Sequence, residues 1–240
     1  MIKVKWSGAL RVCAIGIALA SAVVSGFAER DDNKEMAAEA GIHHAMLQQQ
    51  LFSLPAGAYD APTASHMTER ILRIPPAMLE TLIKRGVQIR LINGRLTDEP
   101  EMHLLRGKSP RGWESSGITW DDVPGVGGKP VIVRIGYSHT GMGHGSANLE
   151  LHETFHAIDS YVLDNISSSR VFRAVFEEEA HLLFGGKQYE ELYPEEYFAE
   201  ASCLLFVSPD TRALVAAKAP ETYRFLNILY RGYDYLSTLD

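Results

Sequence analysis

The chain has 240 residues, of which 46% are hydrophobic and 22% charged, and its formal net charge is −7. These values are ordinary for a folded globular protein of one or two domains, so composition alone indicates no function. The acidic balance argues against nucleic acid and against an anionic membrane surface as binding partners.

The first 28 residues have the pattern of a secretory signal peptide. Lys3, Lys5 and Arg11 make the start basic, residues 12–28 carry no charge, and small residues (VVSGFA) precede a polar stretch. We expect cleavage after Ala28, which leaves 20 basic against 30 acidic residues. The alternative is an uncleaved membrane anchor, because this apolar run lies at the lower edge of what spans a bilayer. With cleavage, the protein is secreted and has no membrane contact.

Cysteine usage is sparse. Cys13 lies in the signal segment, so Cys203 is alone in the mature chain and no intrachain disulfide can form. Stability must therefore come from core packing, and Cys203 is interpreted as a core residue of an apolar helix.

Residues 29–66 are predicted to form a polar N-terminal segment that is partly disordered. The sequence EMAAEAGIHHAMLQQQLF could form a helix, whereas PAGAYDAPTASH is typical of a linker. We place a single domain at 67–240.

The elements expected in that domain change from mixed to helical along the chain. A helix from about Pro76 is stopped by Gly86, and VQIRLIN is a strand closed by the Asn93–Gly94 turn. Residues 98–130 read as irregular, VIVRIGYS is a second strand, and the chain after the glycine-rich GMGHGS is mainly helical. The order predicts an α+β fold, with a small β-sheet followed by a mainly helical subdomain.

The stretch LELHETFHAID, residues 149–159, reads as an amphipathic helix with Ser146 as its N-cap. Its apolar stripe recurs at helical spacing: Leu151, Phe155, Ile158 and Val162. His152 and His156 lie one turn apart on the neighbouring face, where two imidazole nitrogens can converge on one metal ion. Glu153 projects beside them and would take the proton from the attacking water. The alternative is a helix that carries two histidines by chance, so a third ligand is needed.

Several residues could supply that third ligand. Asp159 lies on the same straight helix and therefore cannot surround the ion together with both histidines. His139 and His144 lie in the glycine-rich turn region, where a histidine is usually solvated.

The best candidate comes from YPEEYFAEASCLLF, an apolar helix that carries Glu196 and Glu200 on one face. Buried carboxylates need a charged partner, and a zinc ion held by two histidines is such a partner. Glu196 would then bind the ion and Glu200 would hydrogen-bond a ligand imidazole. The alternative, acids placed at a helix N-terminus for the dipole, suits Glu196 but not Glu200. Three protein ligands and one water are the catalytic form of a zinc site.

The stretches NLELHETFHAIDSY and Y-x3-YPEEYFAE resemble the Pro-Pro endopeptidases, secreted bacterial zinc proteases related to the catalytic domain of anthrax lethal factor. The resemblance covers about residues 70–235, includes GWE, TWDDVPGVGG, RIGYS and GHGS in the same order, and leaves out 29–66. It implies a zincin (HExxH) metalloprotease-like fold with one Zn²⁺ per chain.

The resemblance also implies roles for the matching residues. His152, His156 and Glu196 would bind zinc, Glu153 would be the general base, and the Tyr189 phenol would stabilise the oxyanion.

Four further residues have implied supporting roles. Glu200 would support the site from behind, and Trp113, in the GWE loop that closes over the substrate, would contact it. Glu195 and Arg111 would help to set that loop, although the family typically has a lysine near the position of Arg111.

The implied activity is hydrolysis of Pro-Pro bonds in bacterial surface or extracellular proteins by a monomeric enzyme. If VIVRIGYS is a sheet edge, it could align an extended peptide by backbone pairing. Two alternatives stay open: a lethal-factor-like zinc protease with another specificity, and a non-catalytic zinc-binding protein. The presence of Glu153 argues against the second, since a structural zinc site does not need it.

Overall fold

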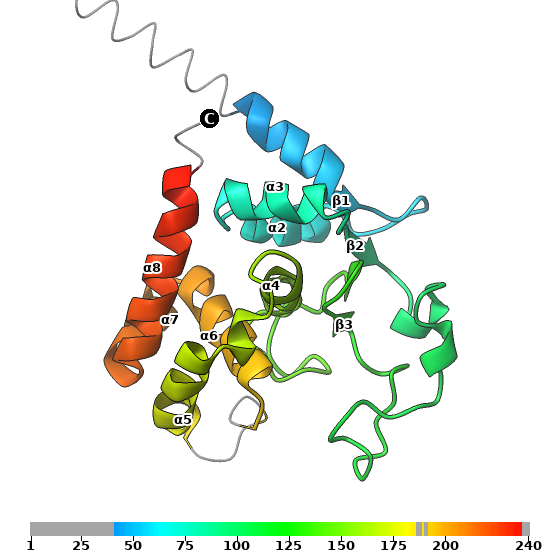
Figure 1. Ribbon diagram of the computed structural model, residues 1–240. Coiled ribbons are helices and arrows are strands. Elements are labelled where there is room, and N and C mark those ends of the chain that lie inside the picture. The colour runs from blue at the N-terminus through cyan, green and yellow to red at the C-terminus, as the bar shows by residue number, and fades with distance from the viewer. Residues whose placement is uncertain (1–40, 186–188, 190–191, 237–240) are drawn as a thin grey trace, which may run out of the picture. The chain divides into compact units, whose positions relative to one another are not determined.

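The computed structural model describes residues 41–185, 189 and 192–236 (Figure 1). The chain divides into two compact units, Met1–Met46 and Leu47–Asp240. The second unit holds every strand and helix described here except the first part of a helix at residues 41–51. The predicted signal peptide lies outside the described residues. In the described part of the chain, no helix is long and apolar enough to cross a membrane.

Residues 41–51 are helical, as the sequence predicted for this stretch. The predicted linker is wrong in its second half, because α2 (Ala61–Ile71) already begins there. Asp60 caps this helix: its carboxylate accepts hydrogen bonds from the Thr63 backbone N–H at 3.1 Å and from the Thr63 hydroxyl at 2.7 Å. Pro62 suits the first turn, where a backbone N–H has no helical partner in any case.

The predicted helix and both strands are present. They are α3 (Pro76–Lys84), β2 (Ile89–Ile92) and β4 (Val131–Arg134). With β1 (Phe52–Ser53) and β3 (Gly125–Val126) they build one sheet in the order β1-β2-β4-β3, in which only β3 is antiparallel. β4, the strand of VIVRIGYS, is therefore not a sheet edge, because β3 pairs along its outer side, and the condition for peptide pairing on it is not met.

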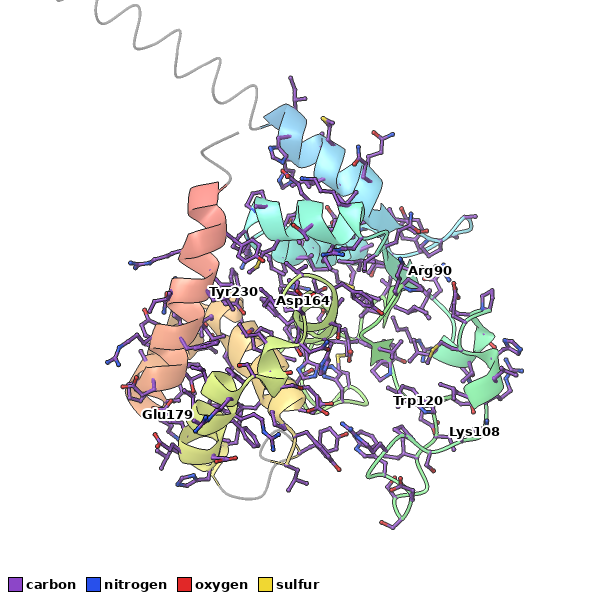
Figure 2. The ribbon with its side chains drawn as sticks, viewed as in Figure 1. Arg90, Lys108, Trp120, Asp164, Glu179 and Tyr230 are labelled. Carbon is purple, nitrogen blue, oxygen red and sulfur yellow. The ribbon has the colours of Figure 1, made fainter. Side chains whose placement is uncertain are left out.

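The two faces of the sheet bury two separate apolar clusters. Ile89, Leu91, Val131 and Val133 face the main core, which the helices complete. Ile92 and Ile132 face a smaller cluster with Leu96 and Met102, against which Trp120 packs. A short 3-10 helix, η1 (Leu96–Asp98), leads into the segment expected to be irregular, residues 98–130. That segment is packed on the sheet through Met102 and Trp120, and it contains a second 3-10 helix, η2 (His103–Leu105), and β3. Figure 2 shows Trp120 on this segment.

The rest of the chain is mainly helical, as predicted. Its elements are α4 (Leu149–Tyr161), η3 (Ile166–Ser168), α5 (Arg170–Phe184), α6 (Pro194–Val207), α7 (Pro209–Lys218) and α8 (Pro220–Leu236). Helix α4 is central: it packs against α6, against α2 and α3, and against β3 and β4 (Figure 1). The α+β prediction, a small sheet followed by a helical subdomain, is confirmed.

The start of α4 differs from the prediction. Asn148, not Ser146, is the N-cap, and its side-chain oxygen accepts a hydrogen bond from the Leu151 N–H at 3.0 Å. Ser146 instead bonds the His144 ring at 2.8 Å. The predicted stripe is buried from Leu151 to Ile158, and Phe155 packs on Phe206 of α6 and Tyr230 of α8. The neighbouring face carries His152, Glu153 and His156 toward the cavity described below.

Candidate active site

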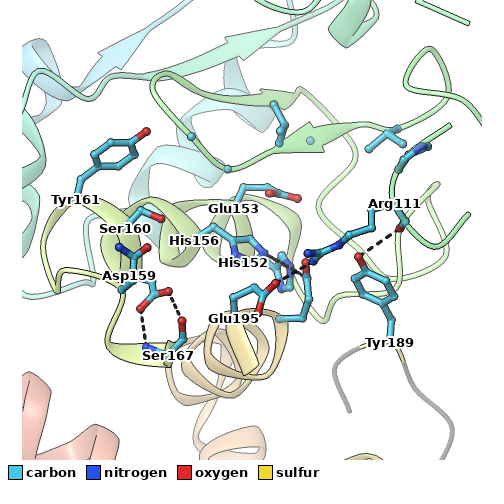
Figure 3. Close-up of a pocket in the computed structure, with 18 of the residues that line it drawn as sticks. Arg111, His152, Glu153, His156, Asp159, Ser160, Tyr161, Ser167, Tyr189 and Glu195 are labelled. Carbon is cyan, nitrogen blue, oxygen red and sulfur yellow. Dashed lines mark hydrogen bonds and ion pairs between the residues drawn. The ribbon is translucent and has the colours of Figure 1, made fainter. Parts of the chain in front are cut away.

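His152 and His156 project from α4 toward the same point (Figure 3). Their Nε2 atoms lie 3.1 Å apart and their rings meet edge to face, at 82°. The i, i+4 spacing accounts for this convergence, since side chains four residues apart lie one above the other on a helix.

Glu196 completes the group from the first turn of α6. Its Oε2 lies 3.4 Å from His152 Nε2 and 3.3 Å from His156 Nε2. The three donor atoms lie within 4.8 Å of one another, which makes this the group among the described residues that could hold a metal ion. Two imidazole nitrogens and one carboxylate oxygen are a donor set of catalytic zinc sites, so the residues present fit zinc.

The electrostatics of this group favour a positive charge between the donor atoms. Burial opposes a charged His152, but hydrogen bonds to Glu196 and Glu200 raise its pKa well above the usual value. Burial also acts to raise the pKa of Glu196, yet hydrogen bonds to both imidazoles outweigh it and lower that pKa. A divalent cation would supply the charge that both shifts favour.

Glu200 lies one turn further along α6, behind His152. One carboxylate oxygen accepts a hydrogen bond from His152 Nδ1 at 2.9 Å, and the other accepts one from the Ala147 backbone N–H at 2.8 Å. An ionised carboxylate can only accept, so the proton of a neutral His152 is on Nδ1 and its Nε2 lone pair faces Glu196.

The other candidate ligands lie elsewhere. Asp159 accepts hydrogen bonds from the Ser167 N–H at 3.0 Å and hydroxyl at 2.5 Å, which ties α4 to η3. His144 bonds the Tyr137 carbonyl at 2.7 Å, and His139 forms a backbone bridge with Asn148. Cys203 is buried, and its thiol donates to the Asn148 carbonyl at 3.4 Å, in agreement with the interpretation as a core residue.

Glu153 lies beside the histidines, under β3 and the glycines that follow it. Burial raises the pKa of its carboxyl, while the histidines and the Gly127 backbone N–H partly offset that effect. A Cβ on Gly127 would lie 2.4 Å from His156 Cβ and 2.9 Å from the Glu153 carbonyl oxygen. Only glycine therefore allows this strand end to lie directly on α4, next to the donor atoms.

Arg111 ties the GWE loop to α6. Its guanidinium lies 2.9 Å from Glu195 and stacks 4.1 Å above the Tyr193 ring. The Tyr189 ring lies 4.9 Å from that of Tyr193, and the Tyr189 hydroxyl donates to the Arg111 carbonyl at 3.4 Å (Figure 3). Burial raises the pKa of Tyr189, so its phenol stays protonated as a hydrogen-bond donor at neutral pH.

A cavity of about 660 Å³ joins these parts. Of the predicted site residues, all but Glu200 line it: Arg111, Trp113, His152, Glu153, His156, Tyr189, Glu195 and Glu196. Sequence reasoning missed other lining residues, among them Trp120, Val123, Tyr161 and Asn165. Trp120 and Val123 belong to the quoted TWDDVPGVGG motif, which was the available signal for them. No motif or residue spacing in the sequence indicates that Tyr161 and Asn165 line the cavity.

The fold and the HExxH helix with its downstream glutamate define a zincin-type metalloprotease. The chain matches the family model described as anthrax toxin lethal factor, N- and C-terminal domain, over residues 39–229. This match begins earlier than the expected resemblance, and it includes α2.

Individual relatives agree with this class. The chain is 44% identical over 194 residues to a Pro-Pro endopeptidase of Paenibacillus alvei, covering 81% of this chain and 89% of that protein. It is 44% identical over 180 residues to a Pro-Pro endopeptidase of Clostridioides difficile, covering 75% of this chain and 81% of that protein. The solved structure of the Paenibacillus alvei Pro-Pro endopeptidase matches with a TM-score of 0.74 at 45% identity, covering 77% of this chain and 100% of that one. The chain therefore belongs to the Pro-Pro endopeptidase family.

Proposed function

We propose that the chain is a zinc endopeptidase that hydrolyses the bond between two consecutive prolines in extracellular polypeptides. The observation that carries the proposal is the convergence of His152, His156 and Glu196 beside the Glu153 carboxylate, inside a cavity with aromatic walls. When bound, zinc would supply a Lewis acid that polarises the scissile carbonyl and makes a water molecule more acidic.

Glu153 is the general base in this proposal. Burial raises the pKa of its carboxyl, so it accepts a proton from the attacking water more readily than an exposed glutamate does. The same carboxyl can then deliver that proton to the leaving nitrogen.

Tyr189 is the proposed hydrogen-bond donor to the oxyanion. Its hydroxyl lines the cavity, and its present bond to the Arg111 carbonyl is long, at 3.4 Å. The phenol can exchange this weak bond for a stronger one to a developing negative charge.

Proline recognition is supported by the walls of the cavity. Trp113, Trp120 and Tyr189 line it, and aromatic grooves suit the fixed, extended backbone of proline-rich segments. A proline provides no N–H for pairing with a strand, so side-chain packing has to carry more of its recognition. Trp113 would contact the substrate, and the Arg111–Glu195 ion pair would hold its loop near α6.

We further propose that the protein acts outside the cell as a monomer. The basic and apolar pattern of residues 1–28 supports export, and cleavage after Ala28 would release the mature chain.

The test is cleavage of a quenched peptide library with X-Pro-Pro-X centres and matched centres without proline. Wild type, Glu153→Ala and the control Glu178→Ala are compared, with the zinc content of each measured. Glu178 is an exposed residue of α5 that does not line the cavity. We expect cleavage between prolines by wild type and by Glu178→Ala only, with about one zinc in all three.

Two results would contradict the proposal. Cleavage of peptides without Pro-Pro would point to a lethal-factor-like protease with another specificity. Zinc in all variants without cleavage of any peptide would point to a non-catalytic zinc-binding protein.

A further inference from the structure

Glu150 is a buried carboxylate that takes no part in the proposed mechanism. It lies in the first turn of α4, it is 0% exposed, and it does not line the cavity. Its Oε1 accepts hydrogen bonds from Arg70 Nε at 2.6 Å, Asn148 Nδ2 at 3.0 Å and the Ser138 hydroxyl at 3.2 Å. A buried charge of this kind is tolerated only when it is paired and hydrogen-bonded.

Arg70 is the cation that neutralises Glu150, and it comes from the last turn of α2, 80 positions earlier in the chain. Its Nη2 also donates to the Ser138 hydroxyl at 3.0 Å. Among the described residues, no donor reaches Glu150 Oε2. Removal of Arg70 would therefore leave a buried carboxylate without a counter-charge, and that carboxylate would move or draw in water. We call Arg70, Ser138, Asn148 and Glu150 the α4 clamp.

The α4 clamp reaches His152 along two routes. Asn148 is fixed through its side chain, and its carbonyl accepts the hydrogen bond from the His152 backbone N–H at 3.1 Å. The neighbouring Ala147 N–H donates to Glu200 at 2.8 Å, and Glu200 accepts the bond from His152 Nδ1 at 2.9 Å. Both the backbone and the imidazole of His152 thus depend on the position of residues 147 and 148.

We propose that Arg70 and Glu150 are positioning residues for the metal site. They set the register of the first turn of α4 against Glu200, and so hold the His152 imidazole in the geometry that a metal requires. This inference rests on the proposed function in one respect: the metal site that Arg70 and Glu150 position is the site that would hydrolyse the peptide. A small shift of residues 147 and 148 would lengthen the hydrogen bond between Glu200 and His152. In metal sites, such a hydrogen bond to a ligand imidazole fixes the orientation of the ring.

A purely structural role is the competing explanation, and Arg90 provides a matched control for it. The Arg70 and Arg90 side chains are 24% and 25% exposed, and both pair with glutamate. Arg90 bonds Glu99 at 2.8 Å and Glu101 at 2.9 Å, and it does not line the cavity. Loss of either arginine takes the counter-charge from a glutamate. Glu150 is fully buried and Glu99 is 22% exposed, so Arg70→Gln should cost more stability, but only Arg70 is linked to His152.

The test compares Arg70→Gln, Arg70→Lys and Arg90→Gln in the mature chain. Four quantities are measured: the zinc dissociation constant by chelator competition, the visible absorption of the Co²⁺ form, the melting temperature of the metal-free protein, and kcat with KM. We expect Arg70→Gln to weaken zinc binding roughly ten- to hundredfold and to change the Co²⁺ spectrum. Its kcat falls while KM stays within about twofold. Arg70→Lys, which keeps the charge, restores part of the loss, and Arg90→Gln binds zinc like wild type.

Equal zinc affinity of Arg70→Gln and Arg90→Gln, whatever their losses in melting temperature, would overturn the inference. If Arg70→Gln does not fold, Ser138→Ala removes one bond to Glu150 without leaving a charge unpaired, and its zinc affinity decides instead. If wild type binds zinc but cleaves no Pro-Pro peptide, the proposed function fails, while the zinc affinities still decide whether the α4 clamp positions His152.

Discussion

Glu200 holds His152 from behind: its carboxylate accepts the Nδ1 hydrogen bond at 2.9 Å and, with its other oxygen, the Ala147 N–H bond at 2.8 Å. His152 lies in α4 and Ala147 directly precedes the N-cap of that helix, whereas Glu200 comes from α6. The contact between these helices therefore fixes the tautomer and the direction of one metal-facing imidazole. Only an acceptor with two free oxygens can satisfy both donors.

Glu200→Gln is expected to weaken zinc binding roughly ten- to hundredfold. Each Glu200 oxygen serves one donor, so in glutamine one of these two places holds an NH₂ that cannot accept, and one buried N–H loses its partner. Chelator competition measures the change. Glu179→Gln is the matched control, because Glu179 likewise accepts with both oxygens, from the Glu221 and Thr222 N–H groups at 2.9 and 2.8 Å. This control should lose stability but keep its zinc affinity, and equal zinc affinity of the two variants would contradict the prediction.

Tyr189→Phe is expected to lower kcat by about 10²- to 10³-fold with little change in KM, the usual cost of one oxyanion donor. The side chain is half-buried at the cavity wall, so stability should change little. Tyr193→Phe is the control, since it keeps the ring on which Arg111 stacks and does not line the cavity. Steady-state kinetics on one Pro-Pro peptide compares the two, and a Tyr189→Phe enzyme as fast as Tyr193→Phe would remove Tyr189 from the mechanism.

Asp60→Ala is expected to destabilise the protein by about 0.5–2 kcal/mol without loss of zinc. The substitution removes both hydrogen bonds to Thr63 and so uncaps α2, which packs against α4. Urea unfolding of the metal-free protein measures the loss. Asp210→Ala, in the first turn of α7, changes the same residue type near a helix start without removing the N-cap, which is Ser208. If Asp60→Ala is no less stable than Asp210→Ala, the Asp60 cap does not contribute to the stability of the fold.

The residues that converge at the candidate metal site were predictable because their spacing along the chain is visible in the sequence. His152 and His156 are one turn apart on an amphipathic helix, and Glu196 and Glu200 are one turn apart on an apolar one. Their meeting needs only that α4 and α6 pack together, which two buried helices of one small domain usually do.

The errors concern choices that tertiary contacts decide. Ser146 and Asn148 are both good N-caps by residue type, and the bond from Asn148 to Glu150 selects between them. The start of α2 was missed although Asp60 and Pro62 form a proper start signal, because small polar residues around them also suit a linker. The inner position of β4 depends on β3, a strand of two residues in a glycine-rich segment that has no periodic pattern.

Gly127→Ala tests how closely the end of β3 must approach α4, the helix that carries His152 and His156. Its Cβ would meet His156 Cβ at 2.4 Å and the Glu153 carbonyl oxygen at 2.9 Å, so either the strand end or α4 has to move. We expect a loss of about 1–3 kcal/mol in stability from overpacking, together with a large fall in kcat/KM, because Glu153 and His156 lie at the point of contact. Gly128→Ala is the control, since its Cβ would make only an ordinary contact of 3.5 Å with the Pro130 carbonyl oxygen. Thermal unfolding and peptide cleavage by the two variants decide the matter. Equal behaviour would mean that the strand end has room to shift, and that the close approach of β3 to α4 is not what holds Glu153 in place.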